Sequence, residues 1–224
     1  MFIGHFAVGF AGKRAAPKAS LQMLFFAALF ADILWPILVG AGVEKVRIAP
    51  GDTAYTPLEF ISYPWSHSLL MLCVWGLVLG LFYRSRTASG RAGLVVGLLV
   101  VSHWVLDWIT HRADMPLYPG GPKVGLGLWN SVPGTMIVEI GMFLVGAWLY
   151  ASATRARDKR GKWAFIALVV FLLGFYIADS LAGSPPPSIN AIWISALVAT
   201  AILLLWAAWI NQHRQNRDIV ENKS

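Results

Sequence analysis

The sequence of 224 residues has little charge and only one cysteine. Charged residues make up 13% of the chain, against about a quarter in average soluble domains, and apolar residues make up 57%. This composition excludes a disordered chain and argues against an ordinary soluble domain. The lone Cys73 excludes an internal disulfide framework and a cysteine-based metal cluster. Any metal in this protein must therefore be held by His, Asp or Glu.

Long apolar runs account for the high hydrophobicity. Each is close to the roughly 20 residues with which a helix crosses a bilayer. None has the alternating pattern of a barrel strand, and only helices or closed barrels satisfy their backbone in lipid. We therefore predict an all-α integral membrane protein with six transmembrane helices, at residues 20–43, 66–83, 92–110, 131–151, 163–182 and 189–210.

The two ends of the chain differ from this pattern. The apolar part of segment 1–19 is too short to cross a membrane, so we expect a short helix that re-enters the membrane or packs against the bundle, followed by a basic segment. The predicted organisation is thus this N-terminal segment, a transmembrane domain over 20–210, and a basic cytoplasmic tail over 211–224.

The net charge of +7 comes from short basic clusters between apolar runs, which argues against a nucleic-acid partner and for the bilayer itself. If the N-terminal cluster is cytoplasmic, 14 of the 18 lysines and arginines lie on that side. Such a bias is a strong positive-inside signal and predicts that both termini are cytoplasmic. The sequence makes no prediction of the oligomeric state.

Several ionisable groups lie inside the apolar runs, where a charge costs at least about 2.5–3.5 kcal/mol and needs a partner or a water-filled cavity. His103, Asp107 and His111 are spaced four apart, so their side chains project from one stripe of a helix. This is the geometry of His-x-x-x-His zinc motifs, with Asp in place of the second His. The alternative is a hydrogen-bonded His–Asp pair that bridges two helices, but in lipid, with further ionisable groups available, a site is favoured.

The depth of these groups is an independent indication. At a rise of about 1.5 Å per residue, groups from four different spans fall between mid-membrane and the outer surface: Asp32, His67, His103, Asp107, His111 and Glu139. His5 reaches the same level if its segment enters from the cytoplasm. Pro36, four residues after Asp32, predicts a kink at Asp32 with a free carbonyl there.

Other roles remain open at this point. Glu139 is interpreted as a ligand, as a residue that orients a ligating His, or as a general base. His67 can equally be an interfacial histidine that contacts water. His111 and Arg112 are candidate substrate-binding residues, since Arg112 suits a phosphate or carboxylate, although interfacial snorkelling explains Arg112 at least as well.

Four stretches in about the first half of the chain resemble the membrane-bound metal-dependent hydrolases, the family of YbcI- and YdjM-like bacterial inner-membrane proteins. They are Gly4-His5, Ala31-Asp32 with Pro36, Ser66-His67-Ser68 and His103-x-x-x-Asp107. That family is assigned by similarity to zinc-dependent phospholipase C-like hydrolases, so the resemblance implies the inner membrane, a metal site and hydrolysis. The second acid of the family's Pro-Asp-x-Asp-like segment is missing here, which indicates a mononuclear site, a partner supplied by Glu139, or a branch without this activity.

These observations together define one hypothesis. His5, Asp32, His67, His103 and Asp107 offer three imidazoles and two carboxylates, a set that suits Zn²⁺, with Mn²⁺ or Fe²⁺ as alternatives. The metal would activate a water, and Glu139 or a non-ligating Asp107 would accept the proton. Because the site lies in the outer half of the membrane, we expect a lipid or lipid-linked ester, phosphoester or amide as substrate.

Two other classes compete with this hydrolase. Buried Asp, Glu and His residues also mark the pathways of proton- or cation-coupled transporters. They also join helices in non-catalytic membrane partner proteins. The position of these groups, between mid-membrane and the outer surface, favours a pocket over a pathway, because a pathway should also place acids in the inner half.

Overall fold

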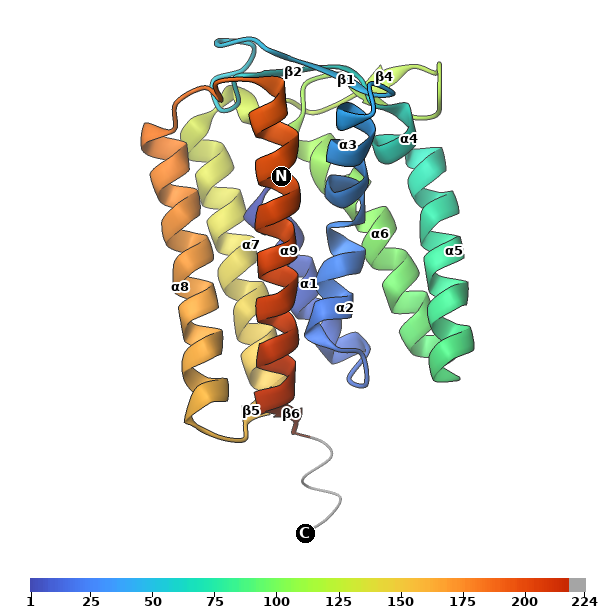
Figure 1. The fold of residues 1–224 in the computed structure, drawn as a ribbon, viewed down its shortest axis with the longest axis vertical. Helices are drawn as coiled ribbons and strands as arrows, with labels where there is room; N and C mark the ends of the chain where they lie inside the picture. Colours follow the sequence, from blue (N-terminus) through green and yellow to red (C-terminus); the bar gives the residue numbers. More distant parts are fainter. Residues whose placement is uncertain (218–224) are drawn as a thin grey trace.

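The computed structural model describes residues 1–217, which form a helical bundle with small strand pairs at both ends (Figure 1). Its helices are α1 (Ile3–Ala15), α2 (Leu21–Ala28), α3 (Phe30–Gly40), α4 (Pro64–His67), α5 (Leu69–Thr87), α6 (Gly90–Thr110), the 3₁₀ turn η1 (Leu128–Asn130), α7 (Val132–Ala153), α8 (Lys159–Ala182) and α9 (Ile189–His213). The strands are β1 (Lys45–Ile48), β2 (Leu58–Ser62), β3 (Met115–Pro116), β4 (Lys123–Val124), β5 (Thr154–Ala156) and β6 (Arg214–Asn216).

Five helices of the described chain are long and apolar enough to cross a membrane, and the bent pair α2–α3 makes a sixth when it is counted as one span. The all-α membrane fold predicted from the apolar runs is thus confirmed. Several boundaries differ from hydropathy alone: the span predicted at 66–83 is α5 at Leu69–Thr87, and the one predicted at 20–43 is split in two and ends at Gly40. Helix α8 begins at Lys159 because the carboxylate of Asp158 accepts a hydrogen bond from the Gly161 amide at 2.7 Å. Helix α9 continues to His213.

The predicted tail beyond residue 210 is partly built into the fold. After the end of α9, strand β6 pairs antiparallel with β5, with Thr154 opposite Asn216. Asn216 also donates a hydrogen bond to the carbonyl of Pro17 at 2.5 Å. The remainder of that predicted tail, residues 218–224 with Lys223, lies outside the described residues.

Helix α1 lies inside the bundle, and its N-terminus is at mid-height (Figure 1). It is apolar around most of its circumference, and Ile3 and Phe10 are fully buried, as expected for a helix with neighbours on all sides. Helix α7 approaches it very closely at Gly146, where an added Cβ would lie 2.7 Å from the Cα of Ala7. The short packed helix predicted for the N-terminal segment is therefore confirmed.

Helices α5 and α6 contact each other backbone to backbone through glycines spaced four apart. A Cβ at Gly76 would lie 2.7 Å from the Gly97 carbonyl oxygen, and one at Gly80 would lie 2.7 Å from that of Gly93. Small residues at this spacing let membrane helices approach and gain van der Waals contact. This packing supports α6, the helix that carries His103 and Asp107.

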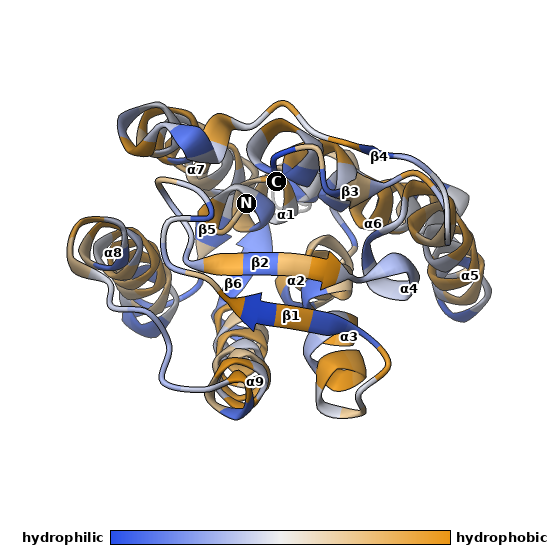
Figure 2. Ribbon diagram, turned by 90° about the horizontal axis from the view of Figure 1, so that it is seen from above, coloured by the Kyte–Doolittle hydropathy of each residue, from blue (hydrophilic) through white to orange (hydrophobic). Residues whose placement is uncertain are grey.

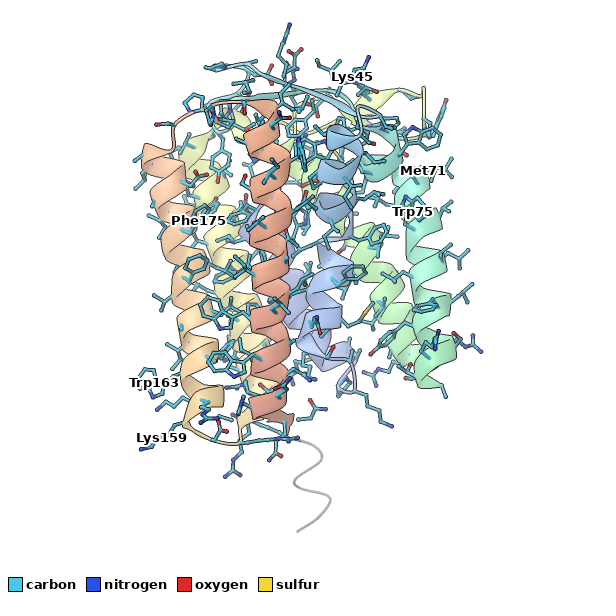
Figure 3. All side chains as sticks on the ribbon, viewed as in Figure 1. Lys45, Met71, Trp75, Lys159, Trp163 and Phe175 are labelled. Carbon is cyan, nitrogen blue, oxygen red and sulfur yellow. The ribbon has the colours of Figure 1, made fainter. Side chains whose placement is uncertain are left out.

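The two ends of the bundle are covered differently. At the hairpin end, defined by β1 and β2, the antiparallel hairpin lies across the middle of the helices (Figure 2). Lys45 lies at this end, whereas Lys159 and Trp163 lie at the opposite end (Figure 3). Between the ends, large apolar side chains such as Leu77 and Leu205 point outward and are more than 60% exposed, as lipid-facing residues would be.

Candidate metal centre

A break in the first long span prepares the site. Helices α2 and α3 are bent by 56° at Leu29. In a continuous helix the Ala28 carbonyl would accept from the amide four residues later. Here it lies 2.9 Å from Nδ1 of His103. The break is therefore at Leu29, three residues before Asp32, where Pro36 predicts the kink. The free carbonyl that finds a partner here is that of Ala28.

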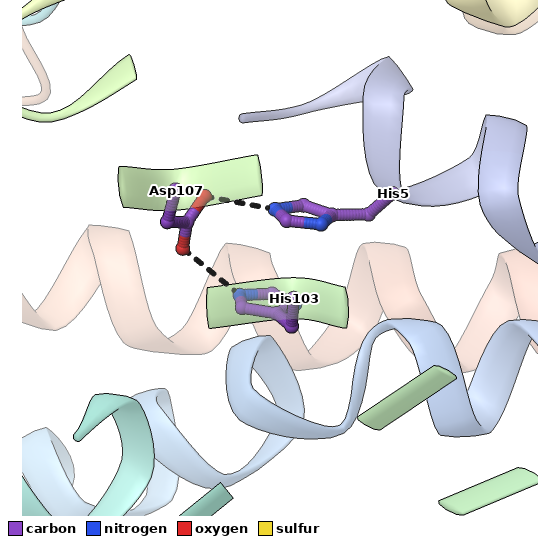
Figure 4. A group of neighbouring side chains, drawn as sticks. All are labelled: His5, His103 and Asp107. Atoms are coloured by element: carbon purple, nitrogen blue, oxygen red, sulfur yellow. Dashed lines mark hydrogen bonds and ion pairs between the residues drawn. The ribbon is translucent and has the colours of Figure 1, made fainter. Parts of the chain in front are cut away.

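Five predicted ligands converge at this break from four helices. His5 comes from α1, Asp32 from α3, His67 from the end of α4, and His103 and Asp107 from one face of α6. Figure 4 shows the imidazoles of His5 and His103 stacked one above the other, each directed at one oxygen of the Asp107 carboxylate. Four of the five side chains are buried, and the Asp32 side chain is 39% exposed. The cluster is therefore reached from the side of Asp32.

The ligand atoms form two overlapping groups of three, Asp32 with His67 and His103, and His5 with His103 and Asp107. Nε2 of His103 is 3.1 Å from Oδ2 of Asp107 and 3.6 Å from Oδ1 of Asp32. Nε2 of His67 is 3.7 Å from each of these two oxygens. Bonds of about 2.0–2.1 Å to a tetrahedral zinc ion place ligand atoms about 3.3–3.4 Å apart. The observed separations lie on both sides of this value, so each of these pairs is compatible with two ligands of one tetrahedral ion.

The hydrogen bond of His103 to Ala28 leaves its other ring nitrogen, Nε2, free for a metal. A carbonyl oxygen only accepts, so Nδ1 carries the proton that is donated to Ala28, and Nε2 keeps its lone pair. This buried Nε2 has no hydrogen-bond partner in the described chain, even though a carboxylate oxygen lies within 3.1 Å. An imidazole held from behind by a carbonyl, with its other nitrogen free, is the usual arrangement of a metal-ligating histidine.

His5 forms a second, overlapping group with His103 and Asp107. Its Nε2 lies 3.0 Å from Oδ1 of Asp107, and its ring stacks on that of His103 with centroids 3.7 Å apart and planes 2° from parallel. Oδ1 of Asp107 also accepts a hydrogen bond from the Met1 nitrogen. Both oxygens of Asp107 are thus directed at the cluster.

The charge of the cluster also favours a cation. With neutral imidazoles, the carboxylates of Asp32 and Asp107 bring two negative charges to a site surrounded by apolar helices. Buried charges are normally paired or bound to a metal. The amino group of Met1 balances one of these charges through its ion pair with Asp107, and a bound cation would balance the other.

Glu139 of α7 is fully buried beside the start of α1. Its Oε2 accepts hydrogen bonds from the amides of Phe2 at 2.8 Å and Gly4 at 3.1 Å, which a helix N-terminus leaves without partners. Its Oε1 has no hydrogen-bond partner among residues 1–217. Glu139 therefore holds the turn that carries His5 and keeps one oxygen available, which fits two of its predicted roles, orienting a ligand and accepting a proton.

His111 and Arg112 lie in the loop layer at the hairpin end. Nδ1 of His111 is 2.9 Å from Asp114, and burial lowers the pKa of this imidazole. Arg112 is engaged with carboxylates, at 2.7 Å from Asp52, 3.4 Å from Asp114 and 3.7 Å from Glu59. These ion pairs link the β1–β2 hairpin to the end of α6, and substrate binding by His111 and Arg112 stays a prediction.

Sequence reasoning missed the groups that hold the imidazoles from behind. The Ala28 carbonyl belongs to the backbone and carries no side-chain signal. The Ser66 hydroxyl lies 2.7 Å from Nδ1 of His67. Ser66 belongs to one of the four stretches that resemble the family, but nothing in the sequence indicates its role. The only indication of a helix break near Leu29 in the sequence is Pro36, which lies about two turns further along the span.

The fold and this cluster define a polytopic α-helical membrane protein with a buried His and Asp centre. The family described as YdjM inner membrane protein matches residues 1–183, and the chain therefore belongs to this family of inner-membrane proteins. The match confirms the family resemblance and extends it well beyond the first half of the chain. No curated protein and no solved structure matches the chain.

Proposed function

We propose that this protein is a metal-dependent hydrolase of the inner membrane, with zinc as its metal and Mn²⁺ or Fe²⁺ as alternatives. The observation that carries the proposal is the convergence of His67, His103, Asp32 and Asp107 at separations of 3.1–3.7 Å. His5 completes the set through the other oxygen of Asp107, with its ring stacked on that of His103. A catalytic zinc uses about three protein ligands and keeps a position open for water.

The chemistry divides between the ion and the chain. When bound, zinc would supply Lewis acidity toward a carbonyl or phosphoryl oxygen and would activate a water for attack. We assign the unpartnered Oε1 of Glu139 to accept the proton of that water, while Oε2 keeps the first turn of α1 in place. Asp107 faces His5 and His103 with its two oxygens and is assigned as a ligand rather than as the base.

The substrate class follows from where the cluster opens. Asp32, the exposed member, is on α3, whose outer faces carry apolar residues such as Ile37. Lysines and arginines gather away from the hairpin end, which supports a cytoplasmic C-terminus and a site in the outer half of the membrane, while Met1 itself is buried beside Asp107. We therefore propose a lipid or lipid-linked ester, phosphoester or amide that enters from the outer leaflet.

The test combines metal content with hydrolysis. Wild-type protein and the variants His103→Ala and Asp107→Asn are purified in detergent, and bound zinc is measured by elemental analysis. His213→Ala is the matched control, because His213 is at the opposite end of the bundle and pairs with Asp158. We expect stoichiometric zinc in the wild type and the control and at least a tenfold lower affinity in the two site variants.

The hydrolysis arm uses liposomes with phosphoester, carboxylester and amide lipids. Cleavage of one class by the wild type, lost in both site variants and kept in His213→Ala, supports the hydrolase. A wild type that binds no divalent metal contradicts the metal centre. Bound metal with no cleavage but with proton or cation flux in proteoliposomes would favour the transporter instead.

A further inference from the structure

We propose that Glu44 is a positioning residue for this centre. It acts through the hydroxyl of Ser66 to keep Nε2 of His67 free of a proton. The inference rests on the proposed metal site and adds to it a residue that lies outside the ligand set. It assigns a role to a carboxylate in the connection between α3 and β1 that no motif of the sequence indicates.

Glu44 is buried, with 1% of its surface exposed. Its Oε1 accepts hydrogen bonds from the backbone amides of Trp65 at 2.8 Å and Ser66 at 2.9 Å. Its Oε2 lies 2.5 Å from the hydroxyl oxygen of Ser66. The carboxylate therefore clamps the first turn of α4, the short helix that ends at His67.

The direction of the next hydrogen bonds follows from this arrangement. A carboxylate oxygen accepts, and Oε1 of Glu44 is already taken by two backbone amides, so the Ser66 hydroxyl donates its hydrogen to Oε2. The hydroxyl oxygen is then left as an acceptor for the His67 ring, whose Nδ1 is 2.7 Å away. Nδ1 must carry the imidazole proton.

The consequence falls on the other ring nitrogen. A neutral imidazole has one proton, so Nε2 of His67 keeps its lone pair and faces Asp32 and Asp107, each at 3.7 Å. The relay thus gives His67 the same tautomer that the Ala28 carbonyl gives His103. Two histidines from different helices are preset as ligands by two different devices.

Glu44→Gln tests this relay with almost no change in shape. The backbone amides of Trp65 and Ser66 hold the carbonyl oxygen of the glutamine at the Oε1 position, so its NH2 group faces Ser66. This NH2 group donates to the Ser66 hydroxyl, which then donates to Nδ1 of His67. The proton of the imidazole then moves to Nε2, where it blocks the lone pair. The matched control is Glu59→Gln. Glu59 lies on strand β2, where it pairs with arginines rather than with a histidine of the cluster.

The first readout requires no metal. Metal-free protein labelled with ¹⁵N at histidine is studied by NMR, with His67→Ala used to assign the signals. We expect His67 as the Nδ1–H tautomer in the wild type and in Glu59→Gln, and as the Nε2–H tautomer in Glu44→Gln. A wild-type His67 protonated at Nε2, or a tautomer unchanged in Glu44→Gln, would overturn the proposal whether or not the protein binds zinc.

The second readout is zinc affinity by competition with a chromophoric chelator. Loss of an outer hydrogen-bond partner typically costs 10–100-fold in metal affinity, so we expect a loss of this size in Glu44→Gln and less than twofold in Glu59→Gln. Ser66→Ala removes the relay without forcing the wrong tautomer, so its loss should be smaller than that of Glu44→Gln. An equal affinity in Glu44→Gln and the wild type overturns the role of Glu44. A wild type that binds no zinc overturns only the metal centre.

Discussion

The closest helix contact of the described chain that bears on the centre is between Gly146 of α7 and Ala7 of α1, and it leads to a quantitative prediction. An alanine Cβ at position 146 would lie 2.7 Å from the Cα of Ala7, whereas ordinary contact begins at 3.4 Å. The carbonyl oxygen of Ala7 is closer still, and backbone atoms cannot turn aside as a flexible side chain can, so Gly146→Ala must move α1 away by at least about 0.7 Å.

This displacement reaches the site because His5 is two residues from Ala7 on the same helix. A ligand atom that moves by about 0.7 Å is well outside the tolerance of about 0.2 Å for metal–ligand distances. We expect zinc affinity to fall by about 10–100-fold. Stability should fall by less than about 2 kcal/mol, because an overpacking cost of about 1–3 kcal/mol is partly offset by the higher helix propensity of alanine, worth about 1 kcal/mol.

The assay compares Gly146→Ala with Gly141→Ala on the same helix. A Cβ at Gly141 meets no atom within 4 Å, so this variant should bind zinc as the wild type does and should be no less stable. Zinc affinity is measured by chelator competition and unfolding by thermal melting in detergent. Equal zinc affinity in the two variants would refute the coupling between the α1–α7 contact and His5.

Three further predictions concern the rest of the fold. Phe10→Ala removes a fully buried ring among four other aromatic rings, and thermal unfolding should show a loss of about 3–5 kcal/mol. Arg112→Gln removes a guanidinium that is 40% exposed, so the same measurement should show a loss below about 1 kcal/mol. The Gly161 amide and, secondarily, the His213 ring lower the pKa of Asp158. The contribution of the Asp158 carboxylate to the stability of the fold is therefore complete above about pH 4 and is lost as the pH falls through the lowered pKa. Melting temperatures of Asp158→Asn should lack this acid-dependent step, and a step of unchanged size would contradict the assignment.

The parts of the site that depend on local periodicity were predictable from the sequence. His103 and Asp107 are one helical turn apart, so their common face follows from the geometry of any helix. The rise per residue also placed Asp32 near mid-membrane and His67 at the outer edge, both in the outer half, without knowledge of the fold. Their convergence to within 3.1–3.7 Å is in line with that calculation.

The parts that depend on tertiary contacts were not predictable. Proline indicates that a helix weakens, but the position of the bend at Leu29 depends on which freed carbonyl finds a donor, here His103 from a distant helix. Glu44 is separated from Ser66 by a hairpin whose path no pattern specifies. The start of α8 depends on a single capping bond from Asp158, a local signal that hydropathy averages away.

The most direct test of the metal centre is X-ray absorption spectroscopy of the zinc-loaded protein. The geometry predicts a shell of nitrogen and oxygen atoms at about 2.0–2.1 Å with the multiple scattering of at least two imidazoles, and no sulfur at about 2.3 Å. The imidazole scattering should decrease in His103→Ala. A sulfur shell, or a shell of oxygen atoms without imidazole, would contradict a centre built from His5, Asp32, His67, His103 and Asp107.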